Sequence, residues 1–346
     1  MIRYLKLTLL PLSAVYSTVV YLRNRLFDLG ILKSEKGKLP TIVVGNLSAG
    51  GTGKTPHVEF LIKTLQQNYK PAILSRGYGR KTRGFILANH LSKFSEIGDE
   101  PLQIKTRFPE LPLAVCEDRL EGITRLKAIT DAGLVVLDDA FQHRKLRGDI
   151  NILLMDYHHP WWGDFTLPAG MLRDNVLEMR RADIIIVSKC PENINSEMMA
   201  YTISRIKPQS QQSLYFTRLV YGTPVQISGK PMPPEQITDV LGFSGIAQPM
   251  HFQLQLAKKF NLRKFVSYPD HHIFSHLDIL YLLKECGNFA PDGFVMITTE
   301  KDAVKLKEMD NTYSVPIFFV PVEIEFVADG QAFQNEILEK LKFITI

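Results

Sequence analysis

Residues 45–56 constrain the fold of this chain more than any other segment does. They read GNLSAGGTGKTP, follow the apolar run TIVV, and precede a stretch whose apolar residues recur at helical spacing. Gly50, Gly51 and Gly53 leave room for backbone amides to surround phosphate oxygens, and a helix N-terminus directly after them favours negative charge. Pro56 fits the first turn of that helix, where a missing N–H costs least. The segment therefore predicts a strand, a phosphate-binding loop and a helix.

The residues of this loop predict a site for ATP and Mg²⁺. Lys54 can reach the β- and γ-phosphates as a catalytic residue, and the hydroxyl of Thr55 can bind Mg²⁺. The spacing departs from the strict P-loop pattern, because Ser48 stands where the first glycine belongs. Ala49 stands where a deviant form of the loop has its signature lysine. The residues predicted to bind the phosphates are Gly50, Gly51, Thr52, Gly53, Lys54 and Thr55.

A second motif carries two adjacent carboxylates. Residues 134–139 read LVVLDD, an apolar run that ends in an acidic pair. At the end of a buried strand, such carboxylates can bind Mg²⁺ directly or through water. Acidic pairs at strand ends are common, so this motif indicates a Mg²⁺ site only in combination with the phosphate loop. Together the two motifs predict Asp138 and Asp139 as Mg²⁺ ligands beside Thr55.

Beyond these motifs, short apolar runs alternate with segments of helical periodicity. This alternation is typical of α/β proteins with a buried parallel sheet. The strands predicted for a first domain are 41–45, 72–75, 113–116, 134–137, 150–155 and 184–187. Those predicted for a second domain are 240–243, 264–268, 294–298 and 316–320, after a proline-rich linker at 218–236. We expect a membrane-associating helix in residues 1–38, a P-loop NTPase-like parallel-sheet domain in 39–218, and the linker with a smaller α/β domain in 219–346.

The N-terminal 38 residues carry the charge imbalance of the whole chain. They hold seven basic and two acidic residues, and the rest balances at 34 of each sign, so the net charge of +5 belongs to this arm. A nucleic-acid-binding protein spreads positive charge over its body, so nucleic acid is not an expected partner. The apolar run 7–22 would rise about 24 Å as a helix, short of the roughly 30 Å hydrocarbon core. Three interpretations stay open: a single span with a short apolar segment, a helix in the membrane surface, and a helix packed on the protein's own core.

Three further clusters contain residue types suited to catalysis or to an anionic substrate. Residues 75–83 read SRGYGRKTR, with four basic side chains and no acidic one. Asp99, in the sequence IGDEP, is a carboxylate of the kind that a kinase needs to take up a hydroxyl proton. Residues 268–272 read YPDHH, where an aspartate precedes two histidines. From the residues alone, each cluster is also compatible with an ordinary loop or turn.

These motifs, in their order along the chain, resemble the tetraacyldisaccharide 4'-kinases, which are the lipid A 4'-kinases of Gram-negative bacteria. The resemblance extends over nearly the whole sequence, so it is far more specific than the phosphate loop alone. The matching segments are 22–28, 44–48 with the loop 50–56, 75–78, 98–101, 117–119, 137–146, 167–170 with Arg173, 243–245, 269–271 and 299–302. Two positions differ from the family pattern, with Ala140 in place of glycine and Asp174 in place of glutamate.

The resemblance implies a kinase that uses ATP and Mg²⁺ to phosphorylate the 4'-hydroxyl of a tetraacylated glucosamine disaccharide 1-phosphate, forming lipid IVA in lipid A biosynthesis. In this family an aspartate and a histidine form a catalytic pair, which places the base at Asp99 and its partner at His271 across an interdomain cleft. The neighbouring His272 stays an alternative for the histidine. The residues that would face the substrate are Arg76, Tyr78 and Arg119.

The resemblance also implies a location at the cytoplasmic face of the inner membrane. The expected partners are the membrane surface and the acylated substrate, and no obligate protein partner is inferred. One alternative is a nucleotide-dependent, membrane-associated P-loop ATPase switch, although Ala49 replaces the lysine that such switches use. Another is a soluble P-loop enzyme for a small metabolite, in which the arm merely packs on the body.

Overall fold

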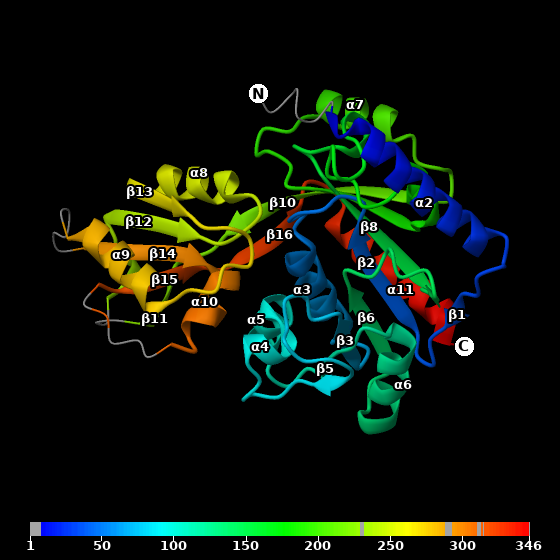
Figure 1. Ribbon diagram of the computed structural model, residues 1–346, viewed down its shortest axis with the longest axis horizontal. Helices are drawn as coiled ribbons and strands as arrows, with labels where there is room; N and C mark the ends of the chain where they lie inside the picture. Colours follow the sequence, from blue (N-terminus) through cyan, green and yellow to red (C-terminus); the bar gives the residue numbers. More distant parts are fainter. Residues whose placement is uncertain (1–7, 229–231, 288–292, 310–312, 314, 346) are drawn as a thin grey trace.

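The computed structural model of the protein describes residues 8–228, 232–287, 293–309, 313 and 315–345. These residues form two lobes of unequal size, each built on a mainly parallel sheet with helices packed on it (Figure 1). The predicted α/β fold, with a P-loop domain and a second, smaller α/β domain, is therefore confirmed.

The larger lobe is built on a nine-stranded sheet in the order β16-β10-β9-β8-β2-β6-β3-β5-β4. All neighbouring pairs are parallel except those of the two edge strands, β16 and β4. The six strands predicted for this domain are confirmed as β2 (Thr41–Asn46), β3 (Pro71–Ser75), β5 (Leu113–Val115), β6 (Leu134–Asp138), β8 (Ile150–Asp156) and β9 (Ile184–Ser188). The other strands are β4 (Ile86–Leu87), β10 (Ser213–Tyr221) and β16 (Val322–Phe326), with a separate pair formed by β1 (Glu35–Lys36) and β7 (Leu146–Arg147).

Helices bury an apolar layer on each face of this sheet. One layer contains Leu61, Ile104 and Phe333, and the other contains Ile123 and Ile206. Because the strands are covered on both faces, their sequences are continuously apolar rather than alternating. The helical elements of this lobe are α3 (Lys54–Leu65), α4 (Phe94–Ile97), α5 (Asp99–Arg107), α6 (Arg119–Ile129), η1 (Trp161–Gly163), η2 (Val176–Arg181), α7 (Ser196–Ile206) and α11 (Gly330–Thr345).

The smaller lobe is also a sheet covered by helices on both faces, with five strands in the order β11-β15-β14-β12-β13. Helix α8 covers one face through Phe252 and Leu256, while α9 and α10 cover the other through Ile279 and Leu306. The four predicted strands are confirmed as β12 (Asp239–Ser244), β13 (Asn261–Ser267), β14 (Phe294–Thr299) and β15 (Ile317–Val320). The remaining elements are β11 (Val225–Ser228), η3 (Pro234–Gln236), α8 (Pro249–Lys259), α9 (His276–Cys286) and α10 (Glu300–Leu306).

The end of the chain returns to the larger lobe, which differs from the predicted division at residue 218. Strand β16 pairs antiparallel with β10 at the edge of the nine-stranded sheet. Helix α11 then buries Phe333, Ile337 and Leu341 completely against that sheet. Two crossings therefore join the lobes, β10 to β11 and β15 to β16 (Figure 1). From the sequence alone these last residues are placed in the second domain, because no local sequence pattern indicates that the chain returns to the first.

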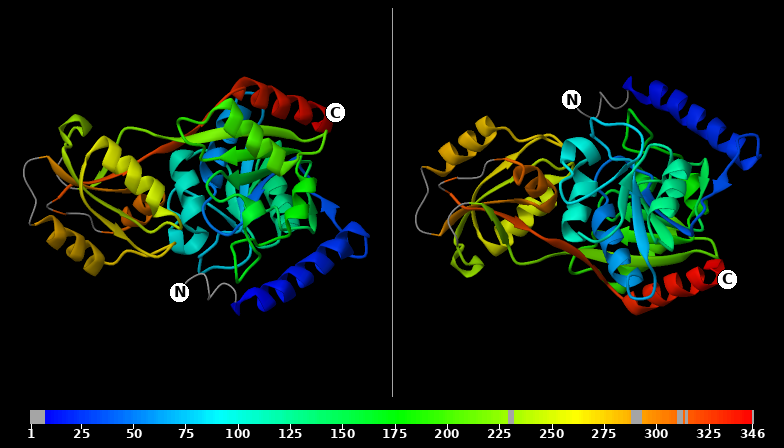
Figure 2. Two further views of the ribbon diagram at one scale, coloured as in Figure 1. Left: turned by 90° about the horizontal axis from the view of Figure 1, so that it is seen from above. Right: turned by 90° about the horizontal axis from the view of Figure 1, so that it is seen from below.

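The N-terminal helix α2 (Leu10–Asp28) lies along one flank of the larger lobe, and α11 lies on the opposite flank (Figure 2). One face of α2 packs on the body, where Ser13 Oγ donates to Thr166 O at 2.8 Å and Asn24 Nδ2 donates to Asp174 Oδ1 at 2.8 Å. Pro11 stands in the first turn, so it does not interrupt the helix. The opposite face exposes the apolar side chains Leu12, Val15, Val19 and Leu22.

The packed face confirms that the helix lies on the protein's own core, and the exposed apolar face leaves the membrane-surface interpretation a prediction. The beginning of the predicted apolar run, at residue 7, lies outside the described residues. Within the described part of the chain, no helix combines the length and apolar character needed to cross a bilayer.

Candidate active site

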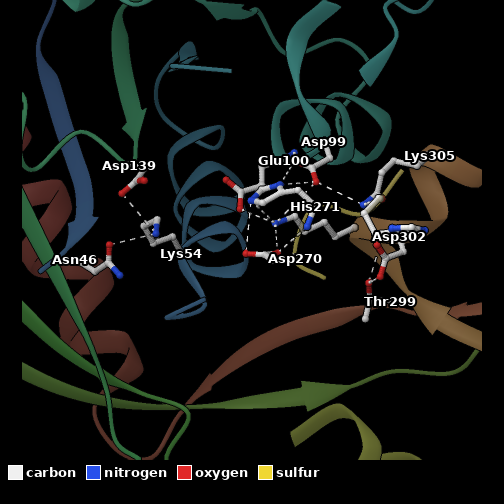
Figure 3. Close-up of polar contacts among 12 residues, drawn as sticks. Asn46, Lys54, Asp99, Glu100, Asp139, Asp270, His271, Thr299, Asp302 and Lys305 are labelled. Carbon is white, nitrogen blue, oxygen red and sulfur yellow. Dashed lines mark hydrogen bonds and ion pairs between the residues drawn. The ribbon is translucent and has the colours of Figure 1, made fainter. Parts of the chain in front are cut away.

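A cleft of about 620 Å³ separates the two lobes. Its wall on the larger lobe is the phosphate loop with the start of α3, and its wall on the smaller lobe includes Gln248, His271 and Lys301. Parallel strands of α/β proteins place their ligand crevice at their carboxyl ends, and the loop after β2 lies at such an end. Figure 3 shows the polar side chains that converge there from both lobes.

The phosphate loop has the conformation that its glycines predict. Gly50 and Gly53 have φ values of 102° and 79°, a region that residues with a Cβ rarely occupy. The loop is supported from β9, because Ser188 Oγ donates to Thr52 O at 2.8 Å and Lys189 Nζ donates to Gly51 O. The residues predicted to bind phosphates all line the cleft: Gly50, Gly51, Thr52, Gly53, Lys54 and Thr55.

Lys54 begins α3 and points to the end of β6. Its Nζ donates to Asn46 Oδ1 at 3.2 Å and lies 3.5 Å from Asp139 Oδ1. Arg173 binds the same carboxylate in a bidentate manner, at 2.8 and 3.0 Å. Burial alone would raise the pKa of Asp139, but the charge of Lys54 and the hydrogen bonds of Arg173 hold it well below its usual value. Asp139 therefore stays ionised and fixes both cations at the mouth of the loop.

Asp138, the last residue of β6, is the opposite case. Its side chain is fully buried, and neither carboxylate oxygen has a hydrogen-bond partner among the described residues. Burial, followed by the nearby charge of Glu100, raises the pKa of Asp138 to about 7. The hydroxyl of Thr52 is likewise buried without a partner. Unpartnered oxygen donors beside a phosphate loop are the ligands that Mg²⁺ takes together with nucleotide phosphates, so the residues present fit that ion.

The structure brings Asp99 and His271 together, although 172 positions separate them in the chain. Asp99 begins α5 in the larger lobe, and His271 Nδ1 of the smaller lobe lies 2.9 and 3.1 Å from its two carboxylate oxygens. Burial would raise the pKa of Asp99, but the hydrogen bond with His271 and the charge of Lys301 lower it to about 2. His272 instead contacts Asp278, at 3.2 Å. Of the two candidate histidines, His271 is therefore the one that pairs with Asp99.

The three predicted substrate residues lie in different surroundings. Tyr78 lines the cleft, and its ring packs against that of His271 with centroids 4.9 Å apart. Arg119 is buried, donates to Glu117 O at 2.9 Å and does not line the cleft. Arg76 is exposed and also lies off the cleft wall. The pKa of Arg119 falls through burial and through the charge of Arg76, so the two arginines lie near each other.

Several residues of the site carry no signal in the sequence by themselves. Arg173 binds Asp139, as described above, and its place among the positions that match the family pattern was its only signal. Lys189 joins three segments, because its Nζ donates to Gly51 O, to Asp156 Oδ2 at 2.9 Å and to Gln248 Oε1 at 2.8 Å. Lys301 belongs to the matched segment 299–302, which is the one sequence signal that could have pointed to it.

The loop between β2 and α3, at the carboxyl end of a parallel sheet, places the protein in the class of P-loop nucleotide-binding enzymes. Comparison with known proteins narrows this class to one family. The family model described as Tetraacyldisaccharide-1-P 4'-kinase matches residues 5–342. The chain therefore belongs to the tetraacyldisaccharide-1-P 4'-kinase family.

Individual relatives agree with this assignment over almost the whole chain. A tetraacyldisaccharide 4'-kinase from Bacteroides thetaiotaomicron is 41% identical over 340 residues, covering 93% of this chain and 90% of that protein. The enzyme of the same name from Flavobacterium johnsoniae is 39% identical, with 98% of both chains covered. Among solved structures, LpxK from Aquifex aeolicus in complex with ATP has a TM-score of 0.75 and 28% identity, covering 97% of this chain and 99% of that one.

Proposed function

We propose that the chain transfers the γ-phosphoryl group of ATP to the 4'-hydroxyl of a tetraacylated disaccharide 1-phosphate, and that the Asp99–His271 pair takes up the hydroxyl proton. The family assignment supports the reaction. The observation that carries the proton role is the contact of 2.9 Å between Asp99 and His271, made across the lobes beside the phosphate loop. A carboxylate and an imidazole from two lobes meet where an acceptor hydroxyl would face the bound nucleotide.

The two members of the pair contribute differently. His271 lines the cleft, while Asp99 is 5% exposed and lies behind the ring. A pKa of about 2 keeps Asp99 ionised at neutral pH, so its carboxylate can accept a hydrogen bond from Nδ1 of the ring and hold the imidazole in place. The proton that leaves the hydroxyl is held by the pair. The finer assignment of Asp99 as the base stays a prediction.

The phosphate side of the cleft supplies positive charge and orientation. Lys54 reaches the β- and γ-phosphates, and the glycine-rich loop surrounds them with backbone amides. Asp138 and Thr55 are the residues that would hold Mg²⁺, with Asp139 close by. When bound there with the nucleotide, Mg²⁺ would supply neutralisation of the charge on the phosphoryl oxygens. Asp139 also holds Lys54 and Arg173 in place, which explains why a second carboxylate follows Asp138.

The acylated acceptor places this chemistry at a membrane. The exposed apolar face of α2 supports a role in binding the bilayer surface, with the basic side chains Arg23 and Arg25 near the lipid headgroups. Because ATP is a cytosolic nucleotide, we place the protein at the cytoplasmic face of the inner membrane. Tyr78 is the substrate residue nearest to the pair, and Arg76 and Arg119 are proposed to bind anionic parts of the headgroup.

Transfer of labelled phosphate from ATP to the disaccharide 1-phosphate in mixed micelles tests this function. We expect label in the lipid product, and no product with an acceptor that lacks the 4'-hydroxyl. An ATP hydrolysis rate that is indifferent to the acceptor, with no labelled lipid, would instead favour a nucleotide-dependent membrane switch.

A further inference from the structure

Helix α10 of the smaller lobe directs two lysines, Lys301 and Lys305, toward α5 of the larger lobe. Residues four apart lie on the same helix face, so both ammonium groups approach the segment that begins with Asp99. Helices α5 and α10 pack directly against each other. The cluster around Asp99, Glu100, His271 and Lys305 is the densest group of polar contacts in Figure 3.

Lys305 is a buried cation that links three segments. Its side chain is 2% exposed, and its Nζ lies 2.9 Å from Asp302 Oδ1. The same nitrogen donates to His272 O at 2.9 Å and lies 3.7 Å from Asp99 Oδ2. Lys305 therefore fixes the loop that carries His271 and at the same time supplies positive charge behind the Asp99 carboxylate. A buried charge is tolerated only with such partners.

Lys301 stands on the cleft side of the same pair. Its Nζ lies 3.2 Å from Glu100 Oε1, 3.6 Å from Asp270 Oδ1 and 3.9 Å from Asp99 Oδ2. It also lies 3.4 Å from His271 Nε2. An ammonium group has donors only, so a neutral His271 must accept at Nε2 and carry its proton on Nδ1. That tautomer is the one that can donate to Asp99.

We propose that Lys301 and Lys305 are positioning residues for phosphoryl transfer, which hold the Asp99 carboxylate and the productive His271 tautomer in place from one face of α10. Both lysines come from the smaller lobe, while Asp99 belongs to the larger one. The assembled pair therefore depends on the contact between α5 and α10. This inference rests on the proposed role of the Asp99–His271 pair.

The charges around the pair support this role. Asp99 faces His271, Lys301 and Lys305, with the carboxylates of Glu100, Asp270 and Asp302 beyond them. Burial would raise the pKa of Asp99, whereas His271 and the two lysines lower it. Burial would lower the pKa of Lys301, but the three carboxylates around it raise it. The carboxylates thus favour the charged form of Lys301, and both lysines favour the ionised form of Asp99.

The test compares Lys301→Met and Lys305→Met with Lys307→Met, an exposed lysine on the same segment. Misplacement of a catalytic group by about 1 Å lowers the reaction rate about 100-fold. We therefore expect kcat to fall about 10- to 100-fold in Lys301→Met and Lys305→Met. The Kd of ATP should stay near the wild-type value, and Lys307→Met should behave as wild type. Loss of an ammonium group lets the Asp99–His271 pair bind a proton more readily. The acid limb of the kcat–pH profile should therefore move to higher pH. Lys301→Arg keeps the charge and should leave that limb in place.

A second comparison separates this inference from the proposed function. If Asp99→Asn alone leaves kcat unchanged, the proposed role of the Asp99–His271 pair is wrong, and so is the positioning role of the two lysines. If Asp99→Asn lowers kcat, the lysine substitutions should cost little more in that background, because they act through Asp99. An equal fold-loss with and without Asp99, or an unmoved acid limb, would overturn the inference and leave the pair intact. Should Lys305→Met fail to fold, Lys301→Met, at the cleft wall, gives the same answer.

Discussion

Asp138→Asn should make the nucleotide-free protein more stable while it removes kinase activity. In the wild-type protein, Asp138 is fully buried, has no hydrogen-bond partner among the described residues and has a pKa raised to about 7. A carboxyl group with a raised pKa costs folding free energy once it is ionised, because burial penalises the charge. Asparagine has nearly the same shape without the charge, so it removes this cost.

The magnitude follows from the size of the shift. An increase from 3.8 to about 7 corresponds to about 4 kcal/mol at 1.36 kcal/mol per pKa unit, as an upper bound on the gain. Between pH 4 and 7 the folded protein binds a proton at Asp138 that the unfolded chain has released. Stability of the wild type therefore falls as pH rises through this window, and above pH 7 the loss is constant. The variant lacks this component of the pH dependence.

The assay is thermal or urea unfolding of the wild type and Asp138→Asn from pH 4 to 8.5, without nucleotide or Mg²⁺. The stability difference should be near zero at pH 4, grow toward pH 7 and then level off. Asp329→Asn is the matched control, because Asp329 is exposed and asparagine also tolerates its φ of 59°. A difference that is independent of pH, or a variant that is less stable at pH 8, would refute the reasoning.

Three further predictions concern the loop, the histidines and the arm. Lys54→Ala should weaken ATP binding and lower kcat by at least about 100-fold, because it removes the cation nearest the transferred phosphate; unchanged turnover would remove the loop from the mechanism. His271→Gln should lower kcat strongly, whereas His272→Gln should stay near wild type, since its ring contacts Asp278; steady-state kinetics with the reverse order would contradict the pairing. Val15→Asp with Val19→Asp should lower co-sedimentation with anionic vesicles, because both side chains are over 60% exposed on α2. Ile129→Asp, at the exposed end of α6, is the control, and equal losses in both proteins would argue against a specific membrane face.

Most of the fold could be predicted because buried parallel strands have a distinctive sequence. Strands such as β2, β8 and β9 are apolar on both faces, and every predicted strand appears in the structure. The return of β16 and α11 to the larger lobe could not be predicted in the same way. Their apolar residues show only that each element has a buried side, and the partner sheet is fixed by tertiary packing.

The site residues also divide into those that form a local sequence pattern and those that are brought together only by tertiary packing. The phosphate loop and Asp138 form local patterns with a direct chemical meaning, so they could be found without a structure. The contact of Asp99 with His271 joins two lobes, and only the family resemblance linked these residues beforehand. Lys301, Lys305 and Arg173 were not assigned roles, because a lysine or arginine on a helix or loop gives no sign of the carboxylate that it meets. Arg76 and Arg119 show the converse, since two basic side chains that were expected to face the substrate do not line the cleft.

A double-substitution cycle on Asp99 and His271 tests the central claim most directly. The rate of phosphoryl transfer to the lipid acceptor is measured at saturating ATP for Asp99→Asn, for His271→Gln and for the double variant, with the Kd of ATP determined for each. General acid–base groups accelerate a reaction about 10²- to 10⁴-fold. When two groups act as one unit, the effects of substituting them are not additive. We predict that each single substitution costs a factor in this range with little change in ATP affinity, and that the double variant is no slower than the slower single one. Two losses that multiply in the double variant, or a parallel loss of ATP affinity, would contradict the account.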